Sequence, residues 1–433
     1  MTGRFHFAAV LAIAFLGPHS LVRAQWESTP HAKAATEALH KSSYRIIDIH
    51  CHAPFPSEAA LRVHLDVLDR VGVTALNIVL LDASGWSYPG GWSEPNLLAW
   101  LELRERFPKR VLVFGTVDFN RVAKQPTFFA DIVTELEGGA SRGMQGIKIW
   151  KNLGMHHKDA DGKLMRIDDP RLDLFWKACG KLGVPVLIHT ADPKEYWYPS
   201  TYNTFQYEGP STGKYFKHRD VPAWEELIRQ RNNVLKKHPK TKFIGAHFAS
   251  LSNDFDELAK TLDEYPNLFV DCAARLRFMY RYHPRAVRAF FVKYQDRILF
   301  GTDDFLIADP KLLDDADGLK QWKEKHSMFY SRYLEYFETD HVGIIDPYGT
   351  YREWMRLTGI KLPPEVLEKL YHANAEKLLP PPCRAVELRG WTCRITSAMR
   401  ALSSASVFGT GVSTSLSKIV TLTRSLGRSC WTA

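Results

Sequence analysis

Two histidines stand two positions apart near the start of the chain, in the stretch IIDIHCH at residues 46–52. Side chains at positions i and i+2 of a β-strand point to the same side of a sheet. His50 and His52 can therefore coordinate the same ion, because a neutral imidazole nitrogen is a common metal ligand. Two imidazoles leave a metal shell incomplete, so other elements must supply the remaining ligands.

Short apolar, β-branched runs recur through the middle of the chain, each about as long as a buried strand. They lie at 44–50, 73–81, 110–118, 143–150, 184–190, 241–248, 267–273 and 297–303. Most gaps between them hold a segment with the apolar spacing of a helix. The clearest of these are 57–72, 95–108, 170–183, 222–239, 284–296 and 363–380.

This alternation of eight strands with helices predicts a (β/α)8 TIM barrel over residues 44–380. An open doubly wound sheet has the same alternation, but the Gly-rich phosphate turn typical of that fold does not follow the first strand. Local signals support the helices: Ser57 is a candidate N-cap, and Gly72 a candidate helix end. In a TIM barrel the chemistry lies at the carboxyl ends of the strands.

Polar and aromatic side chains stand at those predicted strand ends. They are His50, His52, Lys148, Trp150, His189, His247, Asp271, Arg275, Arg277, Asp303 and Asp304. A third imidazole from His189 and a carboxylate from Asp303 would complete a mixed nitrogen and oxygen shell. Such a shell suits zinc, or manganese or iron with additional waters.

The ordered motifs DIHCH, IKIW, VLIHTAD, GAHFAS and LFGTDDF, followed by YHANAEKLL, resemble the amidohydrolase superfamily. The resemblance is to its amidohydrolase-related branch, which holds decarboxylases beside lactone hydrolases, and it covers residues 44–379. It implies a metal-dependent enzyme. The ordered set is specific for the superfamily but says little about the reaction.

The resemblance also implies roles for individual residues. His50, His52 and His189 would bind the metal. Asp303 would be a further ligand, or the base that takes a proton from metal-bound water. His247 would bind a second ion or polarise the substrate.

Four further strand-end residues have open roles. In binuclear members of the superfamily a carbamylated lysine bridges two ions, and Lys148 matches that position. Alternatively, Lys148 is an ammonium that pairs with a carboxylate or contacts substrate. One of Arg275 and Arg277 could bind a substrate carboxylate through a bidentate contact, or pair with Asp304 or another local acid. Trp150 is a candidate for substrate contact.

Two more features of the sequence bear on the site. Asp48 precedes the histidines with the same strand parity, so it could hold an imidazole tautomer, or cap loop backbone instead.

The long loop 191–221 is rich in aromatic residues, which favours a lid over disorder. The loop could instead pack on its neighbours or form an oligomer contact. The start of a calcium-loop pattern at 158–163 lacks the closing glutamate and is discounted.

These residues favour a hydrolase in which metal-activated water attacks a C–N or C–O carbonyl centre of a small molecule. Non-oxidative decarboxylation on the same metal is the alternative reaction, in which the site protonates a carbon. A barrel that binds a ligand without turnover is the alternative from another class, and the intact ligand set argues against it. Homo-oligomerisation stays open.

The charge of the chain does not favour a nucleic-acid partner, and we expect none. The formal net charge is +9, but residues 381–433 carry +6 of it and residues 1–24 carry +2. The stretch 25–380 therefore has a net charge of +1 and no basic bias for nucleic acid. The segment 381–433 is basic and Ser/Thr-rich, so it reads as disordered or as sequence foreign to the fold.

The first 24 residues predict a signal peptide. Arg4 precedes an apolar stretch at 7–17, and small residues end at Ala24. We therefore expect a secreted or periplasmic protein that begins near Gln25, with an uncleaved anchor as the alternative. The mature chain should not insert stably into a membrane.

The six cysteines do not predict a disulfide framework. Cys51, Cys179 and Cys272 lie in or beside apolar segments, where cysteine usually acts as a small buried hydrophobe. A chain of this length does not need disulfides to stabilise a core.

Overall fold

The computed structural model describes residues 34, 38–81, 94–199, 215, 220–349 and 356–380. The predicted signal peptide at 1–24 and the basic segment 381–433 lie outside the described residues. So does most of the aromatic loop 191–221.

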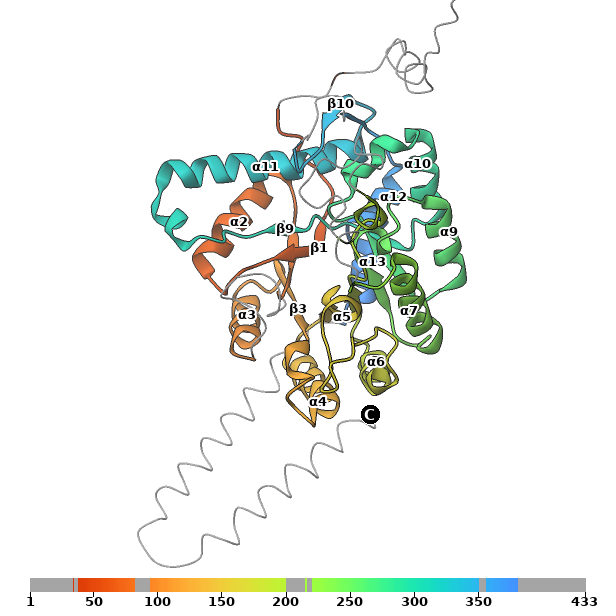
Figure 1. The fold of residues 1–433 in the computed structure, drawn as a ribbon. Coiled ribbons are helices and arrows are strands. Elements are labelled where there is room, and N and C mark those ends of the chain that lie inside the picture. Colours follow the sequence, from red (N-terminus) through yellow and green to blue (C-terminus); the bar gives the residue numbers. More distant parts are fainter. Residues whose placement is uncertain are drawn as a thin grey trace, which may run out of the picture. The chain divides into compact units, whose positions relative to one another are not determined.

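A parallel sheet of short strands lies at the centre of the fold (Figure 1). Its strands are β1 (Ile47–His52), β2 (Ala75–Val79), β3 (Val111–Thr116), β4 (Gly146–Ile149), β5 (Val186–Ile188), β6 (Phe243–Gly245), β7 (Leu268–Asp271), β8 (Ile298–Leu299) and β9 (Asp304–Phe305). Neighbours along the chain are neighbours in the sheet from β1 to β8, and β9 pairs with the free side of β1.

The last strand closes the sheet into a ring. β8 pairs with β7, and β9 pairs with β1. Between these two short strands, the backbone N–H of Ile49 donates to Phe300 O at 3.0 Å, and that of Asp303 donates to His50 O at 2.7 Å. Residues 298–305 thus act as one interrupted eighth strand, and the predicted TIM barrel is confirmed.

Helices alternate with the strands, and most of them cover the outside of the barrel (Figure 1). They are α2 (Glu58–Val71), α3 (Glu94–Arg106), α4 (Phe128–Ser141), α5 (Asn152–Met155), α6 (Asp173–Leu182), α7 (Trp224–Lys237), α8 (Ala246–Ala249), α9 (Phe255–Glu264), α10 (Pro284–Lys293), α11 (Ala316–Glu338), α12 (Pro364–Glu368) and α13 (Asn374–Leu378). The six helical segments expected from the sequence are present. Helices α4, α5, α8, α9 and α11, and the antiparallel pair β10 (Val342–Ile345) and β11 (Arg356–Thr358), are additional.

Helix α2 shows how local sequence sets these boundaries. The Ser57 side chain accepts a hydrogen bond from the Ala60 backbone N–H at 3.2 Å, as an N-cap does. Gly72 ends the helix with a φ of +84°, and a Cβ there would lie 2.2 Å from the Ser42 carbonyl oxygen. Both predicted boundaries are confirmed.

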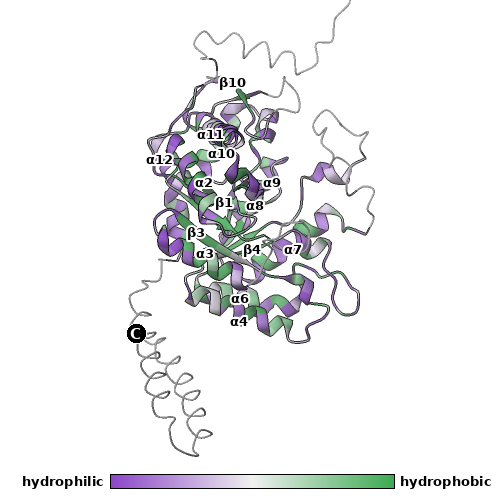
Figure 2. Cartoon of the chain, turned by 90° about the vertical axis from the view of Figure 1, so that its left-hand side faces the viewer, coloured by the Kyte–Doolittle hydropathy of each residue, from purple (hydrophilic) through white to green (hydrophobic). Residues whose placement is uncertain are grey.

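The core has two layers. A small cluster fills the barrel interior and includes Ile47, Ile49, Val79, Phe114, Leu187, Ile244 and Leu299. A larger cluster lies between the strands and the helices that cover them. Figure 2 shows this arrangement as apolar strands such as β1 and β4 surrounded by helices with mixed surfaces.

The described cysteines match the expectation from sequence. Cys51, Cys179 and Cys272 are buried and free, as small hydrophobes would be. No helix in the described part of the chain combines the length and the apolar character needed to cross a bilayer.

Candidate metal centre

A bulge in β1 explains how both histidines face the barrel interior. The pairing of β1 with β2 changes register between Asp48 and Cys51. Ile47 and Ile49 pack in the inner cluster, whereas Cys51 packs in the outer one. Because a bulge inserts one extra residue, His50 and His52 turn inward after Ile49.

Three lone-pair atoms converge at the end of β1. The Nε2 atoms of His50 and His52 lie 3.2 Å apart. Asp303 Oδ1 lies 3.3 Å from His50 Nε2 and 3.0 Å from His52 Nε2. Both imidazoles are buried.

Hydrogen bonds on the far side of each ring fix which nitrogen faces this cluster. His50 Nδ1 lies 2.8 Å from Asp271 Oδ2, and His52 Nδ1 lies 3.0 Å from Val79 O. Carboxylates and carbonyls only accept, so both Nδ1 atoms carry the proton. Each Nε2 then presents a bare lone pair, which is the form that binds a metal.

Asp303 sits in a strained conformation beside the histidines. Its φ is +65°, a value that non-glycine residues rarely adopt. Burial favours the neutral acid, but His50 and His52 in their protonated form, together with the Lys148 ammonium, outweigh burial and lower the pKa of Asp303 to about 2. The carboxylate is therefore ionised at neutral pH and can act as a ligand or as a base.

His189 lies beside this cluster rather than within it. Its ring centroid is 4.5 Å from that of His247, and its Nε2 lies 3.8 Å from Asp192 Oδ1. That Nε2 is buried without a hydrogen-bond partner among the described residues. Burial, with Lys151 as the next cause, lowers the pKa of His189 well below its usual value, so the ring is neutral.

His247 begins a left-handed turn after β6. The four residues 247–250 have φ values of +61°, +55°, +54° and +62°, and none of them is glycine. Each such residue costs on the order of 1 kcal/mol. The turn leaves His247 Nδ1 2.8 Å from Ala273 O, so Nδ1 donates and the bare Nε2 cannot donate to a substrate oxygen.

Small residues make this turn possible. A Cβ at Gly245 would lie 2.5 Å from the Ala249 Cβ, so the chain can fold back only with glycine at position 245. Asp271 then anchors the turn, because its Oδ1 accepts from the His247 backbone N–H at 2.7 Å. Its Oδ2 holds His50, so Asp271 joins the two histidines.

Lys148 and Trp150 extend the cluster from β4. Lys148 Nζ donates to His50 Nε2 over 3.1 Å and lies 5.0 Å from the Trp150 ring centre. Burial lowers the pKa of Lys148 to about 8. The Trp150 ring packs 5.0 Å from the His52 ring, and its Nε1–H donates to Leu80 O.

The two arginines after β7 differ in their surroundings. Arg275 is buried, and its Nε has no hydrogen-bond partner among the described residues. Arg277 Nε lies 3.6 Å from the buried Asp346 Oδ2, and its guanidinium lies over the Tyr348 ring at 4.6 Å. The acid expected beside Arg277 is thus Asp346, which follows β10, and not Asp304.

The parity expected for Asp48 is wrong, because the bulge reverses it. Within the described part of the chain, Asp48 forms no hydrogen bond with an imidazole; it accepts from the backbone N–H groups of His50 and Thr302, each at 3.1 Å. Tyr330 O–H donates to it at 2.9 Å, and Cys51 Sγ lies 3.0 Å away. Of the two roles considered, Asp48 caps backbone.

The described part of loop 191–221 is fixed beside His189. Asp192 accepts from Lys151 Nζ at 2.5 and 2.6 Å and from Tyr215 O–H at 2.5 Å. Tyr215 also packs against Trp197, with ring centroids 4.4 Å apart. This aromatic packing agrees with an ordered loop base, while the rest of the predicted lid lies outside the described residues.

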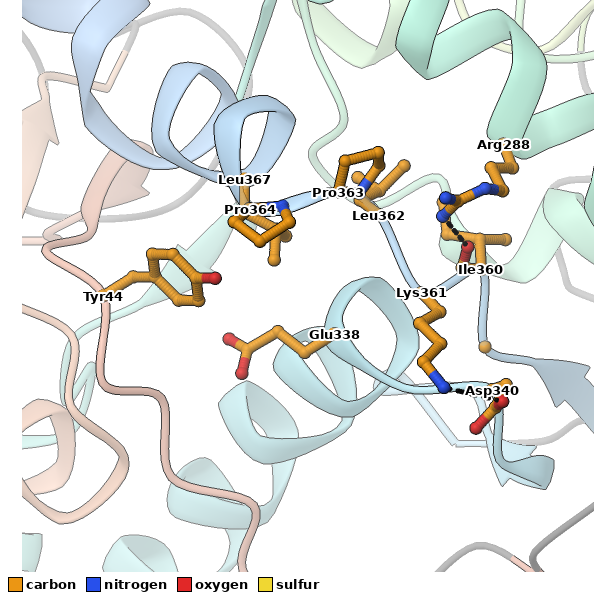
Figure 3. Close-up of a pocket in the computed structure, with 11 residues that line it drawn as sticks. Tyr44, Arg288, Glu338, Asp340, Ile360, Lys361, Leu362, Pro363, Pro364 and Leu367 are labelled. Carbon is orange, nitrogen blue, oxygen red and sulfur yellow. Dashed lines mark hydrogen bonds and ion pairs between the residues drawn. The ribbon is translucent and has the colours of Figure 1, made fainter.

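A cavity of about 780 Å³ lies away from these residues (Figure 3). Tyr44, which precedes β1, lines it, together with Glu338 and Pro364. Glu338 is already paired there, because Tyr371 O–H donates to it at 3.0 Å and His40 Nε2 lies 2.9 Å from it. Because its carboxylate is already paired, Glu338 is not a candidate catalytic group in this cavity.

The family model described as amidohydrolase matches residues 47–380, which is more than half of the chain. The chain belongs to the amidohydrolase family. It is accordingly a metal-dependent enzyme, and the family implies a divalent ion. A search of curated protein sequences gave no match.

Solved structures also resemble this amidohydrolase. One is 2,6-dihydroxybenzoate decarboxylase from Rhizobium, with 14% identity over 78% of this chain and 98% of that chain, at a TM-score of 0.42. Another is 4-oxalomesaconate hydratase from Rhodopseudomonas palustris, with 14% identity over 83% and 99% and a TM-score of 0.44. At these scores the likeness does not indicate the reaction of this chain.

The residues of this amidohydrolase fit a divalent ion. His50, His52 and Asp303 form one group whose ligand atoms all lie within 4.8 Å of one another, and His50, His247 and Asp271 form another. The imidazoles of His50 and His247 are kept neutral, since burial lowers the pKa of both. His189 lies outside both groups.

Sequence reasoning did not assign a role to Asp271, Asp192 or Tyr348. Asp271 had a visible signal, because it ends the seventh strand. The contacts of the other two depend on tertiary structure: Asp192 receives a partner from the loop at Tyr215, and Tyr348 reaches Thr302 O from the segment after β10.

Proposed function

We propose that this amidohydrolase hydrolyses a C–N or C–O bond at the carbonyl centre of a small molecule. The observation that carries the proposal is the ionised Asp303 carboxylate, which lies beside the buried Nε2 atoms of His50 and His52. An ionised carboxylate at a metal cluster can take a proton from water, which is the first need of hydrolysis.

The ion would be held by His50, His52 and Asp303, with His189 as the further ligand. In support, His189 Nε2 is a buried nitrogen without a partner among the described residues, and such groups are costly unless something binds them. Three nitrogens and one carboxylate oxygen favour zinc, with manganese or iron as alternatives. The bound ion supplies Lewis-acid activation of water and of the substrate carbonyl.

The protein's own groups divide the remaining work. Asp303 accepts the proton of the attacking water. Cationic Lys148 and Arg275 stabilise the negative charge that develops on the carbonyl oxygen. His247 presents Nε2 as an acceptor, so it receives a proton or a ligand and does not polarise the substrate by donation. Trp150 forms an apolar wall beside His52.

Arg275 favours non-oxidative decarboxylation as a second candidate. Its guanidinium is buried and its Nε lacks a hydrogen-bond partner among the described residues, which suits a site that binds a substrate carboxylate. Arg275 also acts on His247, because burial and then the charge of Arg275 lower the pKa of His247. A substrate carboxylate there would pair with a buried cation that already acts on the Asp192 carboxylate through space.

The test joins metal analysis to a substrate panel. The purified protein is assayed on esters, lactones, amides and aromatic carboxylic acids, before and after chelation, with zinc or manganese added back. Hydrolysis transfers oxygen from ¹⁸O-labelled water to the product acid, whereas decarboxylation releases CO2 and places deuterium on carbon in D2O. A metal-loaded protein without either reaction would be a binding barrel and would contradict the proposal.

A further inference from the structure

Arg231 on α7 is a buried cation that the proposed chemistry does not use. Its side chain is fully buried. Its hydrogen-bond partners among the described residues are the Ala249 carbonyl oxygen and the side-chain oxygen of the adjacent Asn232. No carboxylate is among them. The Glu257 carboxylate acts on its charge through space, but the hydrogen bonds of Arg231 all go to neutral groups. A buried cation bonded to neutral groups is costly, which points to a use for the contact at Ala249.

Ala249 is the third residue of the left-handed turn 247–250 that carries His247. Three backbone hydrogen bonds bridge the turn: Ser250 N–H reaches Ala246 O at 3.3 Å and His247 O at 3.2 Å, and Leu251 N–H reaches Phe248 O at 2.9 Å. Left-handed residues other than glycine relax readily to negative φ. The turn therefore needs contacts from outside to persist.

Two side chains supply such contacts. Arg231 NH1 donates to Ala249 O. Ser250 Oγ donates to Ala191 O at 2.6 Å and accepts from the Ala191 backbone N–H at 3.3 Å. Ala191 lies two residues beyond His189. The turn thereby ties the end of β5, with His189, to the end of β6, with His247.

We propose that Arg231 is a positioning residue that holds the left-handed turn 247–250 and, through it, the imidazole of His247 against Ala273 O. Arg231 does not touch the reacting groups. It acts by donating to Ala249 O from α7, outside the barrel. The effect on turnover rests on the proposed function, because it assumes that His247 takes part in the reaction.

The test compares Arg231→Met with Arg104→Met as a matched control. Arg104 is also buried, and its Nε donates to Gln145 Oε1, which precedes β4 at the end opposite Lys148. The first readout is the long-range ¹H–¹⁵N spectrum of the histidine rings, in which the His247 signal is assigned by its loss in His247→Gln. The second is kcat/KM on whichever panel compound the protein turns over, and the third is bound metal.

We expect Arg231→Met to change the ¹⁵N shifts of His247 and to lower kcat/KM on the order of tenfold to a hundredfold. Bound metal should stay at the wild-type level, and Arg104→Met should leave His247 and turnover unchanged. Ala249→Gly introduced into Arg231→Met should recover most of the lost turnover, because glycine adopts positive φ readily and fits beside Gly245. A loss of mere core packing would not be rescued in this way.

An unchanged His247 signal in Arg231→Met would overturn the proposal, as would failure of Ala249→Gly to restore turnover. Should Arg231→Met not fold, Arg231→Lys decides by the same readouts, since it keeps the cation and one donor and should lie between wild type and loss. A wild-type protein without turnover would refute the proposed function alone, because the His247 spectrum still tests the turn.

Discussion

Asp48 and Thr302 lie 254 positions apart in the sequence, and the Thr302 backbone N–H donates to Asp48 Oδ1 at 3.1 Å. The Thr302 hydroxyl also donates to the same carboxylate, as does the His50 backbone N–H. Asp48 thus joins the strand that carries His50 to the residue before Asp303. The buried Asp48 carboxylate therefore links the first and the last barrel strand at two proposed metal ligands, His50 and Asp303.

We predict that Asp48→Asn weakens metal binding although Asp48 is not a ligand. The asparagine NH2 would face groups that now donate to the carboxylate, such as Tyr330 O–H. Loss of a partner that orients ligands lowers metal affinity by about tenfold to a hundredfold. Competition with a chelator of known affinity measures the change.

Asp159→Asn is the matched control for that measurement. Asp159 also caps backbone, accepting from the N–H groups of Asp161 and Lys163, and it pairs with Arg171 away from the histidines. Its replacement should leave metal affinity as in wild type. Equal affinities for wild type and Asp48→Asn would show that Asp48 does not position the ligands.

A second prediction concerns the pH dependence of stability. Burial lowers the pKa of His64 to about 4, from about 6.5 in the unfolded chain. The unfolded state therefore binds the proton more readily, so stability that is fully present above pH 6.5 is lost as pH falls towards 4. The shift corresponds to about 3 kcal/mol for this fully buried ring.

Urea unfolding between pH 4.5 and pH 7 tests this prediction. His64→Gln should flatten the dependence of the unfolding free energy on pH by up to about 1.4 kcal/mol per pH unit in this window. Other buried histidines, including His189, will keep part of the slope. An identical slope in wild type and His64→Gln would count against a neutral buried His64.

A third prediction contrasts two glycines. Gly245→Ala should destabilise the fold and disturb the His247 turn, because its Cβ would lie 2.5 Å from the Ala249 Cβ. Gly138→Ala in α4 meets nothing within 4 Å and should stabilise the fold by about 0.5–1 kcal/mol. Thermal unfolding of both variants checks the opposite signs. Stabilisation by Gly245→Ala would mean that the turn does not fold back on β6 as described.

A fourth prediction is that residues after Pro382 are dispensable. The family model ends at residue 380, and the segment 381–433 has the basic, Ser/Thr-rich composition of a disordered chain. Truncation after Pro382 should leave the melting temperature and turnover unchanged. A marked drop in either quantity would show that the segment packs on the barrel.

The barrel and its strand-end residues could be predicted from sequence because the strand rule fixes which end of each strand carries chemistry. His50, His52 and Asp303 come together as that rule requires. The side of the sheet to which Asp48 points could not be predicted. The β1 bulge reverses the parity of the strand, and no residue type in the sequence marks that bulge.

The left-handed turn at His247 was also hidden from sequence reasoning. Positive φ is usually marked by glycine, and residues 247–250 contain none. Gly245 lies before the turn, where glycine is needed because Ala249 packs closely against it. Helix α11 and the β10–β11 pair went unlocated because they follow the last barrel strand, where the βα alternation no longer predicts the next element.

The most direct test of the account is the amount of bound metal in single alanine variants, measured together with turnover and folding. Replacing His50, His52, His189 or Asp303 should lower metal affinity by orders of magnitude and abolish turnover while the fold survives. His247→Ala should keep metal at least in part and lose turnover. Full metal content and full rate in His50→Ala or Asp303→Ala would contradict the proposed metal centre.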